Sequence, residues 1–397
     1  MRRSNLTAVV AGMSLALGTA AAFAGAQPHA PTKPSHYTVY ALENSLGGTF
    51  AQGTSIDEKN EIGGFGTRPG DTIMHALLWR AKLKPEDLGT LGGPNSAIAW
   101  PNKNEHGIYA GISETAADNP LGESWSCAVA IFYLAPPTKK ICQGFRWQNG
   151  NMQALPPLPG GYDSFATGIN NDNEIVGWAE NGVHEPTCNA PQVLQFEAVV
   201  WEPDGSVRQL PPAAGDLDGA ATAINDKGQV VGISGICGNA VGGASALHML
   251  LWDQRSTTDL GNLGGQYWHT PMDISETGSV TGFSDLVGDS VERPNFHAFF
   301  WNKKRGLQDL NTLPGDSLSE GLGVNDRDQV VGVSYPSSHA FIWQNGTLTD
   351  LNTLVAAKSN LILLAAQDIN DNGVITGQAQ DKNTGALVGF IAVPKWR

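Results

Sequence analysis

A short pattern of apolar and polar positions recurs along the whole chain. Residues 224–232 read Ile-Asn-Asp-Lys-Gly-Gln-Val-Val-Gly, and close variants end at Gly64, Gly111, Gly177, Gly232, Gly282, Gly332 and Gly377. Two apolar segments separated by Asn, Asp and Gly are typical of two strands joined by a tight turn. The sequence therefore predicts seven copies of a β-hairpin.

The turn position held by Gly228 requires a residue that tolerates positive φ. The other copies place Asn60, Gly107, Asn173, Gly278, Asp328 and Gly373 there, and all of these residue types tolerate it. The side chain of Asn225 is expected to hydrogen-bond the turn backbone, as are Asn170, Asn325 and Asn370 in other copies. This motif is thus first of all a folding signal.

Two further segments follow each hairpin. One reads His-Ala-Phe-Phe-Trp at 297–301, and after a polar turn the other reads Asp-Leu-Asn-Thr-Leu-Pro-Gly at 309–315 or Asp-Leu-Gly-Asn-Leu-Gly-Gly at 259–265. Four short strands per unit make the blade of a β-propeller. Paired small residues after the fourth strand let the chain turn into the next blade.

The two ends of the repeat region complement each other. The chain begins on a fourth strand at 37–42 and ends on a third strand at 387–393. Pairing these strands would complete the seventh blade, close the ring and remove the exposed sheet edges. An open solenoid would need capping repeats, which the sequence lacks. We therefore predict an all-β fold, one seven-bladed β-propeller domain over residues 36–397.

The first 26 residues predict a secretory signal peptide. Arg2 and Arg3 precede an apolar run at 6–23, and Ala24-Gly25-Ala26 supplies a cleavage pattern. A membrane anchor is the alternative, but the run is barely long enough to span a bilayer. Residues 27–35 are expected to be a flexible leader. The mature protein is expected to be exported and not inserted in a membrane.

Charge and cysteine content narrow the partners and the compartment. The formal charge is −14, which disfavours nucleic acid and anionic membranes as partners and favours a monomer. Four cysteines fit an oxidising compartment and allow three pairings. We favour Cys127 with Cys142, within one long insertion, and Cys188 with Cys237, between corresponding loops of successive units. A metal site is the alternative, but no C-x-x-C pair is present.

The repeated His-Ala-Phe-x-Trp, Asp-Leu-x-x-Leu-Gly-Gly and Ile-Asn-Asp-x-Gly-x-Val-Val-Gly segments resemble the HAF-repeat family of bacterial extracellular proteins. The resemblance covers residues 37–393. It implies export, to the periplasm or beyond the cell, and a repeated β architecture, with no reaction or catalytic residues to transfer. The second unit departs most, because its turn at 101–107 is longer and Tyr109-Ala110 replaces Val-Val.

Binding is expected on the face that carries the links between second and third strands, because these links vary greatly in length. Residues just after the Leu-Gly-Gly turns are expected to line the channel mouth on that face. Aromatic rings beside carboxylates suit a glycan, and an extracellular protein is the other candidate ligand. The alternative is that these are ordinary loop residues, with the aromatic rings packing between blades. The candidates are Tyr162, Asp163, Asp218, Tyr267, Trp268, His269 and Asp316.

No linear catalytic motif is present, so a binding or scaffold protein is favoured over an enzyme. A polysaccharide lyase or glycoside hydrolase remains the first alternative, with His269 or His106 as base and Tyr162 or Tyr267 as acid. A structural envelope or matrix protein is the second alternative.

No cofactor or metal is predicted, although a structural calcium is left open. His75, His248, His297 and His339 occupy one equivalent position, but third strands of different blades lie too far apart to share an ion. Residues 368–373 match the start of a calcium loop, yet Ala379 stands where an EF-hand needs its bidentate Glu.

Overall fold

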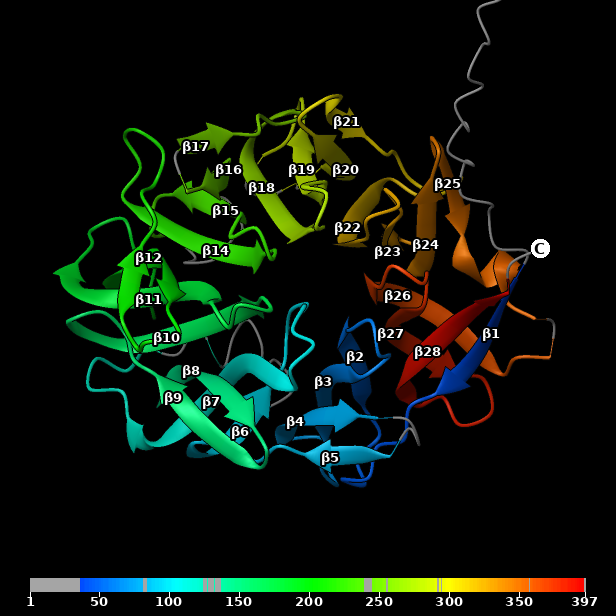
Figure 1. Ribbon diagram of the computed structural model, residues 1–397, viewed down its shortest axis with the longest axis horizontal. Helices are drawn as coiled ribbons and strands as arrows, with labels where there is room; N and C mark the ends of the chain where they lie inside the picture. Colours follow the sequence, from blue (N-terminus) through cyan, green and yellow to red (C-terminus); the bar gives the residue numbers. More distant parts are fainter. Residues whose placement is uncertain are drawn as a thin grey trace, which may run out of the picture. The chain divides into compact units, whose positions relative to one another are not determined.

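The computed structural model forms a ring of seven four-stranded antiparallel sheets, a seven-bladed β-propeller (Figure 1). It describes residues 36–80, 84–123, 127, 132, 137–238, 245–254, 256–290, 293, 295–356 and 358–395. The predicted signal peptide at 1–26 and leader at 27–35 lie outside these residues. Within the described part of the chain, no helix is both long and apolar enough to cross a membrane.

The blades follow one another along the chain, and six of them use four consecutive strands. Blade 1 comprises β2 (Ala51–Ile56), β3 (Ile62–Thr67), β4 (Met74–Trp79) and β5 (Pro85–Asp87). Blade 2 comprises β6 (Gly92–Ala97), β7 (Ile108–Asp118), β8 (Lys140–Gln148) and β9 (Asn151–Leu155). Blade 3 comprises β10 (Gly160–Ile169), β11 (Ile175–His184), β12 (Leu194–Trp201) and β13 (Val207–Gln209). Blade 4 comprises β14 (Asp218–Ile224), β15 (Val230–Gly235), β16 (Ala246–Asp253) and β17 (Ser256–Asp259).

The remaining blades keep the same order. Blade 5 comprises β18 (Gly264–Ile274), β19 (Val280–Leu286), β20 (Phe296–Asn302) and β21 (Gly306–Asp309). Blade 6 comprises β22 (Leu318–Val324), β23 (Val330–Tyr335), β24 (His339–Gln344) and β25 (Thr347–Asp350), followed by the 3₁₀ turn η3 (Leu351–Leu354). Blade 7 comprises β26 (Leu361–Ile369), β27 (Ile375–Asp381), β28 (Leu387–Lys395) and β1 (His36–Ala41).

The predicted ring closure is confirmed. β1 pairs antiparallel with β28, with Thr38 opposite Val393, so the first strand of the chain is the outermost strand of the last blade. Figure 1 shows blue β1 beside red β28 at the rim, while first strands such as β14, β18 and β22 lie around the centre. Closure pairs residues 390–395 of β28 with β1. An unpaired edge strand would invite aggregation.

The hairpin turns have the predicted chemistry. The seven turn positions all have positive φ, from 56° at Asp328 to 84° at Gly278. Asn225 Oδ1 accepts hydrogen bonds from the backbone N–H groups of Lys227 and Gln229, as the sequence suggested. Its Nδ2 atom donates to Ser275 O of the next blade, at 3.0 Å. The asparagine therefore stabilises its own turn and the contact between blades at once.

In six of the seven blades, the glycine that ends the repeat lies opposite a β-bulge in the first strand. In blade 6, Gly332 pairs with Gly321, and the register shifts before the next pair. A Cβ atom on Gly332 would lie 1.9 Å from Glu320 O and 2.7 Å from the ring of Phe341. The glycines ending the other repeats, Gly64, Gly111, Gly177, Gly232, Gly282 and Gly377, each face a first-strand carbonyl oxygen at 1.8 to 2.2 Å in the same way. The bulge therefore demands glycine.

The apolar core is divided into layers between adjacent blades. One layer joins Ala76 and Leu78 of blade 1 to Tyr109 and Trp147 of blade 2, and each of these side chains is at most 2% exposed. The repeated third-strand tryptophans also bond across this boundary. The Nε1 atoms of Trp79, Trp201 and Trp252 donate to Glu43 O, Pro156 O and Pro211 O, which follow the fourth strand of the preceding blade.

The repeated histidines each pair with a nearby aspartate. His75, His297 and His339 contact Asp87, Asp309 and Asp350 through Nδ1 at 2.8 to 3.0 Å, joining the third and fourth strands of one blade. His248 contacts Asp216 instead, at 2.7 Å. These histidines therefore bond to nearby aspartates instead of sharing an ion.

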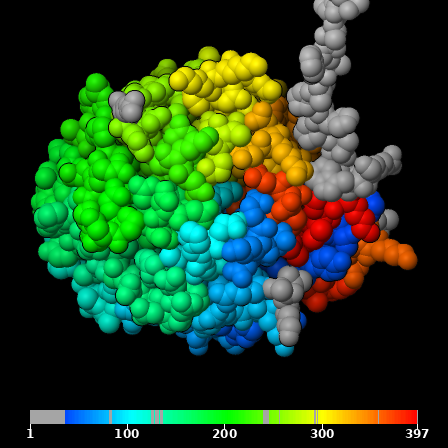
Figure 2. Space-filling view, viewed as in Figure 1, coloured from blue at the N-terminus to red at the C-terminus, as the bar shows by residue number. Residues whose placement is uncertain are grey.

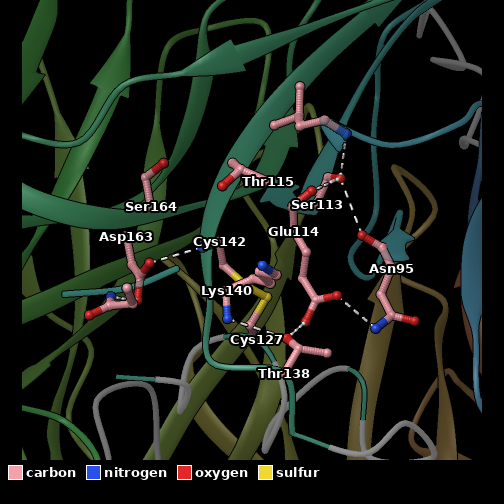
Figure 3. The surroundings of a disulfide bond; sticks show 12 residues. Asn95, Ser113, Glu114, Thr115, Cys127, Thr138, Lys140, Cys142, Asp163 and Ser164 are labelled. Atoms are coloured by element: carbon pink, nitrogen blue, oxygen red, sulfur yellow. Dashed lines mark hydrogen bonds between the residues drawn. A yellow bond between two sulfur atoms is a disulfide. The ribbon is translucent and has the colours of Figure 1, made fainter. Parts of the chain in front are cut away.

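Both predicted disulfides are present. Cys127 is joined to Cys142 within blade 2, close to Asp163 of blade 3 (Figure 3). Cys188 of blade 3 is joined to Cys237 of blade 4, and the adjoining backbone forms a parallel bridge between Cys188 and Gly238. The second disulfide links the loops of successive blades, as the spacing suggested.

Candidate functional site

The strand order divides the connections between two faces of the ring. The turns between first and second strands lie on one face, called the turn face below. The links between second and third strands, and those entering the next blade, lie on the opposite loop face. The gap between ribbons at the centre is largely filled by side chains in the space-filling view (Figure 2).

Two of the predicted site carboxylates hold neighbouring blades together. Asp163 Oδ1 accepts from Cys142 N at 2.9 Å, and Asp218 Oδ1 accepts from Phe196 N at 3.1 Å. In both cases the donor lies on the third strand of the preceding blade. Both aspartates are buried. They therefore contact the preceding blade and do not line an open channel mouth.

Trp268 and His269 of blade 5 are also packed against neighbouring side chains. Trp268 makes edge contacts with Phe283 and Phe296, with ring centroids 5.3 and 5.7 Å apart. His269 is buried, and its Nδ1 lies 2.9 Å from Ser284 Oγ. Burial lowers the pKa of His269 to about 4. His106 lies in the hairpin turn of blade 2 on the turn face, whereas His269 lies in the middle of β18, so the two histidines proposed as a base are not equivalent in position.

The other candidates remain partly accessible on the loop face. Tyr162 and Tyr267 are half-buried. Asp316 accepts hydrogen bonds from Ser337 N at 3.0 Å and from Ser337 Oγ at 2.6 Å, which close the short link of blade 6. The role of these residues in ligand binding stays a prediction.

A cavity on the ring axis opens on the turn face, opposite the face that the sequence favoured. Its volume is about 180 Å³, and all seven blades contribute to its lining. Apolar Ile56, Ile274, Val324 and Ile369 line it together with carboxylates of the hairpin turns. The cavity is too small for a drug-sized ligand, which usually occupies ~300 Å³ or more.

Lys103 occupies the axis beside this cavity. Its Nζ atom lies 2.8 Å from Asp368 Oδ1 of blade 7 and 3.4 Å from Asp273 Oδ2 of blade 5. Both carboxylates are fully buried and also accept backbone N–H groups, Ile56 N for Asp368 and Val324 N for Asp273. One lysine thus connects three blades across the centre.

The sequence contains a sign of this ion pair, a charged residue at a repeat position that is otherwise apolar. Lys103 stands where the other repeats have Ile56, Ile169, Ile224, Ile274, Val324 or Ile369. Asp273 and Asp368 stand where several other repeats have Gly or Ala. The same contact explains the partial calcium-loop match at 368–373, because Asp368 binds Lys103 and backbone donors with both of its oxygens.

A closed ring of hydrogen bonds surrounds the cavity. The second residue of a hairpin turn donates its backbone N–H to the side chain at the same turn position of the next blade, as Asp226 does to Glu276. In blade 5 the donor is the following residue, Thr277. Acceptors in chain order are Glu58, Glu105, Asn171, Asp226, Glu276, Asp326 and Asp371. Six of these seven side chains are acidic. Their carboxylates therefore serve chiefly to stabilise the ring.

Stability is expected to fall as pH rises, because several buried carboxyl groups hold protons in the folded protein. Burial raises the pKa of Asp218 to about 7. A raised pKa in the folded state contributes stability that is complete below the unfolded pKa and is lost as pH rises through about 7. Asp218→Asn keeps the acceptor for Phe196 N and is expected to gain on the order of 2 kcal/mol at pH 8 over the wild type.

Urea unfolding at pH 5 and pH 8, in EDTA, measures this effect. Asp204→Asn, at an exposed site, is the matched control and should not change the pH slope. An Asp218→Asn variant with the wild-type pH slope would contradict the prediction.

Comparisons with known proteins support the fold. The chain is similar to the solved structure of a streptogramin B lyase, at 10% identity over 90% of this chain and 97% of that chain, with a TM-score of 0.50. A catalytically inactive virginiamycin B lyase from Staphylococcus aureus with quinupristin gives 9% identity, 90% and 99% coverage, and a TM-score of 0.49. An oligogalacturonate lyase in complex with manganese gives 10% identity, coverage of 91% of this chain and 98% of that chain, and a TM-score of 0.48. At 10% identity, the similarity to the streptogramin B lyase structure shows a shared fold alone. No family model and no curated protein matches the chain.

Proposed function

We propose that the protein is an exported β-propeller scaffold that binds a partner protein outside the cytoplasm through its loop face. The observation that carries this proposal is that most of the exposed large apolar side chains lie on the loop face. Seven large apolar residues are exposed among the described residues, and five belong to loop-face links or the strand ends beside them. These five are Leu121, Val183, Leu217, Ile236 and Val287. These five residues share one face of the ring. Contiguous exposed apolar patches are typical of protein interaction sites.

The loop face is also reinforced in a way that suits binding. A disulfide within the blade 2 link and another between the blade 3 and blade 4 links limit loop movement. Ordering loops before binding lowers the entropy cost of association. The disulfides further support an oxidising compartment, either periplasmic or extracellular, and the repeated motifs support membership of the HAF-repeat family.

A glycan is the second candidate ligand, because Tyr162 and Tyr267 are partly exposed on the same face. Sugar rings stack on such aromatic faces. A glycan array and a polysaccharide depolymerisation assay separate the rivals. Retention without product would favour a glycan-binding module, whereas shortened product would favour the lyase or hydrolase alternative.

The test of the protein-binding proposal compares three forms of the mature protein. Wild type, the Leu217→Asp/Ile236→Asp/Val287→Asp variant and a Val393→Asp control are immobilised, and exported proteins of the source organism are passed over them. Val393 is an exposed aliphatic residue at the rim, 38% accessible. We expect one partner to be retained by wild type and control and lost from the triple variant. Equal retention by all three forms would overturn the loop-face assignment.

A further inference from the structure

Three buried carboxylates meet on the loop face between blades 2 and 3. Glu123 follows β7 in the long link of blade 2, Asp163 lies near the start of β10, and Glu180 lies in β11. None is more than 2% exposed, and one oxygen of each lies within 4.8 Å of the others. Among the ion pairs between described residues, none includes Glu123, Asp163 or Glu180, so no basic side chain there neutralises them. The cluster concentrates negative charge away from water.

Two oxygen atoms in this cluster have no hydrogen-bond donor. Glu123 Oε1 accepts from Val193 N at 2.7 Å and Leu194 N at 2.8 Å, whereas Glu123 Oε2 is buried without a partner. Gln192 donates from Nε2 to Glu180 Oε1 at 2.8 Å, and its own Oε1 is buried and unpartnered. A buried oxygen without a donor is costly, and a carboxylate oxygen more so. A cation is the species that satisfies such oxygens together.

We propose that Glu123, Asp163 and Glu180 bind a calcium ion, with the Gln192 side-chain oxygen as a further candidate ligand. Ca²⁺ takes 6–8 oxygen ligands at about 2.3–2.6 Å, so opposite ligands are up to about 5 Å apart. The spacing of the three carboxylates fits that span. The donors are all oxygens, and the adjacent Cys127 and Cys142 are joined in a disulfide, so thiolate-preferring metals are disfavoured. Mg²⁺ keeps several water ligands and suits a buried set less well.

The rival arrangement keeps the cluster intact with protons in place of the ion. Burial, then the charge of Glu123, raises the pKa of Glu180 to about 7. Burial, then the charge of Glu180, raises that of Asp163 well above its usual range. Asn119 Nδ2 donates to Asp163 Oδ2 at 3.2 Å and helps to disperse its charge. Direct measurement of bound ion separates the two arrangements.

A bound ion would join the blade 2 link to blade 3. The link already contains one disulfide, and the blade 3 link is joined to blade 4 by the other. Three successive blades would then be cross-linked on the loop face. This inference stands apart from the proposed function, because ion binding is measured without any partner protein.

Equilibrium dialysis of the EDTA-treated mature protein against radioactive Ca²⁺ tests the site. We expect one ion per chain in the wild type, a rise in the thermal unfolding temperature with Ca²⁺, and no displacement by equimolar Mg²⁺. Glu123→Gln preserves the acceptor for the Val193 and Leu194 N–H groups but removes the charge, and is expected to weaken binding at least ~10-fold. Asp163→Asn is the second variant, with the same expectation.

Glu114→Gln is the matched control. Glu114 is as buried as Glu123 and lies in the same blade, but its two oxygens accept from Thr138 Oγ1 and Asn95 Nδ2 (Figure 3). This variant is expected to bind Ca²⁺ as the wild type does. Absence of bound Ca²⁺ in wild type at millimolar concentration would overturn the proposal and leave the protonated cluster. Equal weakening by Glu114→Gln and Glu123→Gln would also overturn it.

Discussion

Gly332→Ala is expected to destabilise the folded protein by about 3 kcal/mol or more. The added Cβ would lie 1.9 Å from Glu320 O and 2.7 Å from the Phe341 ring. Neither neighbour can move easily, because one is backbone at a bulge and the other is a fully buried ring. Urea unfolding followed by tryptophan fluorescence measures the loss.

Gly168→Ala provides the matched control for this prediction. Gly168 is also a buried glycine in a bulged strand, but a Cβ there would meet Val176 Cγ2 at 3.4 Å, an ordinary contact distance. We expect the control to change stability much less than Gly332→Ala. Similar losses in both variants would mean that the bulge carbonyl does not dictate the repeated glycine.

Lys103→Met is expected to cost about 3–5 kcal/mol at neutral pH, because it leaves two buried carboxylates without a counter-ion. Burial raises the pKa of Asp273 to about 7 even with Lys103 opposing the shift, and burial raises that of Asp368 as well. Removing the lysine raises both pKa values further. The folded variant then binds more protons than the unfolded chain, so its deficit grows as pH rises through 7 and shrinks toward pH 5.

Urea unfolding of wild type and variant at pH 5 and pH 8 measures this pH-dependent difference. Lys59→Met is the control, since the Lys59 side chain is 58% exposed and lies 3.7 Å from Glu105, a pair worth ~1 kcal/mol or less. Adding Asp273→Asn and Asp368→Asn to Lys103→Met is expected to restore much of the stability at pH 8. The same deficit at both pH values would contradict an electrostatic origin.

The fold could be predicted because its determinants are local and repeated. Each hairpin carries its own turn residues. Within one blade, the glycine that ends the repeat packs between the bulge carbonyl and a third-strand phenylalanine, as Gly332 does with Phe341. The strand sequence at the two ends showed how the ring closes. Disulfide partners could be predicted from loop position, since Cys188 and Cys237 occupy corresponding links.

The site residues were harder to predict, because burial depends on contacts between blades. Asp163 and Asp218 follow the Leu-Gly-Gly turns, as expected for a channel mouth, but each turns toward the third strand of the preceding blade. Glu123 was not predicted as a site residue, because it lies in an irregular link and far from Glu180 in the sequence. Only folding brings its unpaired oxygen to the other two carboxylates.

The pairing of β1 with β28 sets the order in which the protein can be completed. β1 is made before the other strands of the ring, and it has no pairing partner until β28 has been made. Any chain interrupted before Leu387 keeps an unpaired β1 and a blade with a bare edge. Chains that lack β28 therefore present the exposed strand edges that chaperones and proteases bind, while a chain that contains β28 covers them. Closure of the ring thus distinguishes chains that contain β28 from chains that lack it.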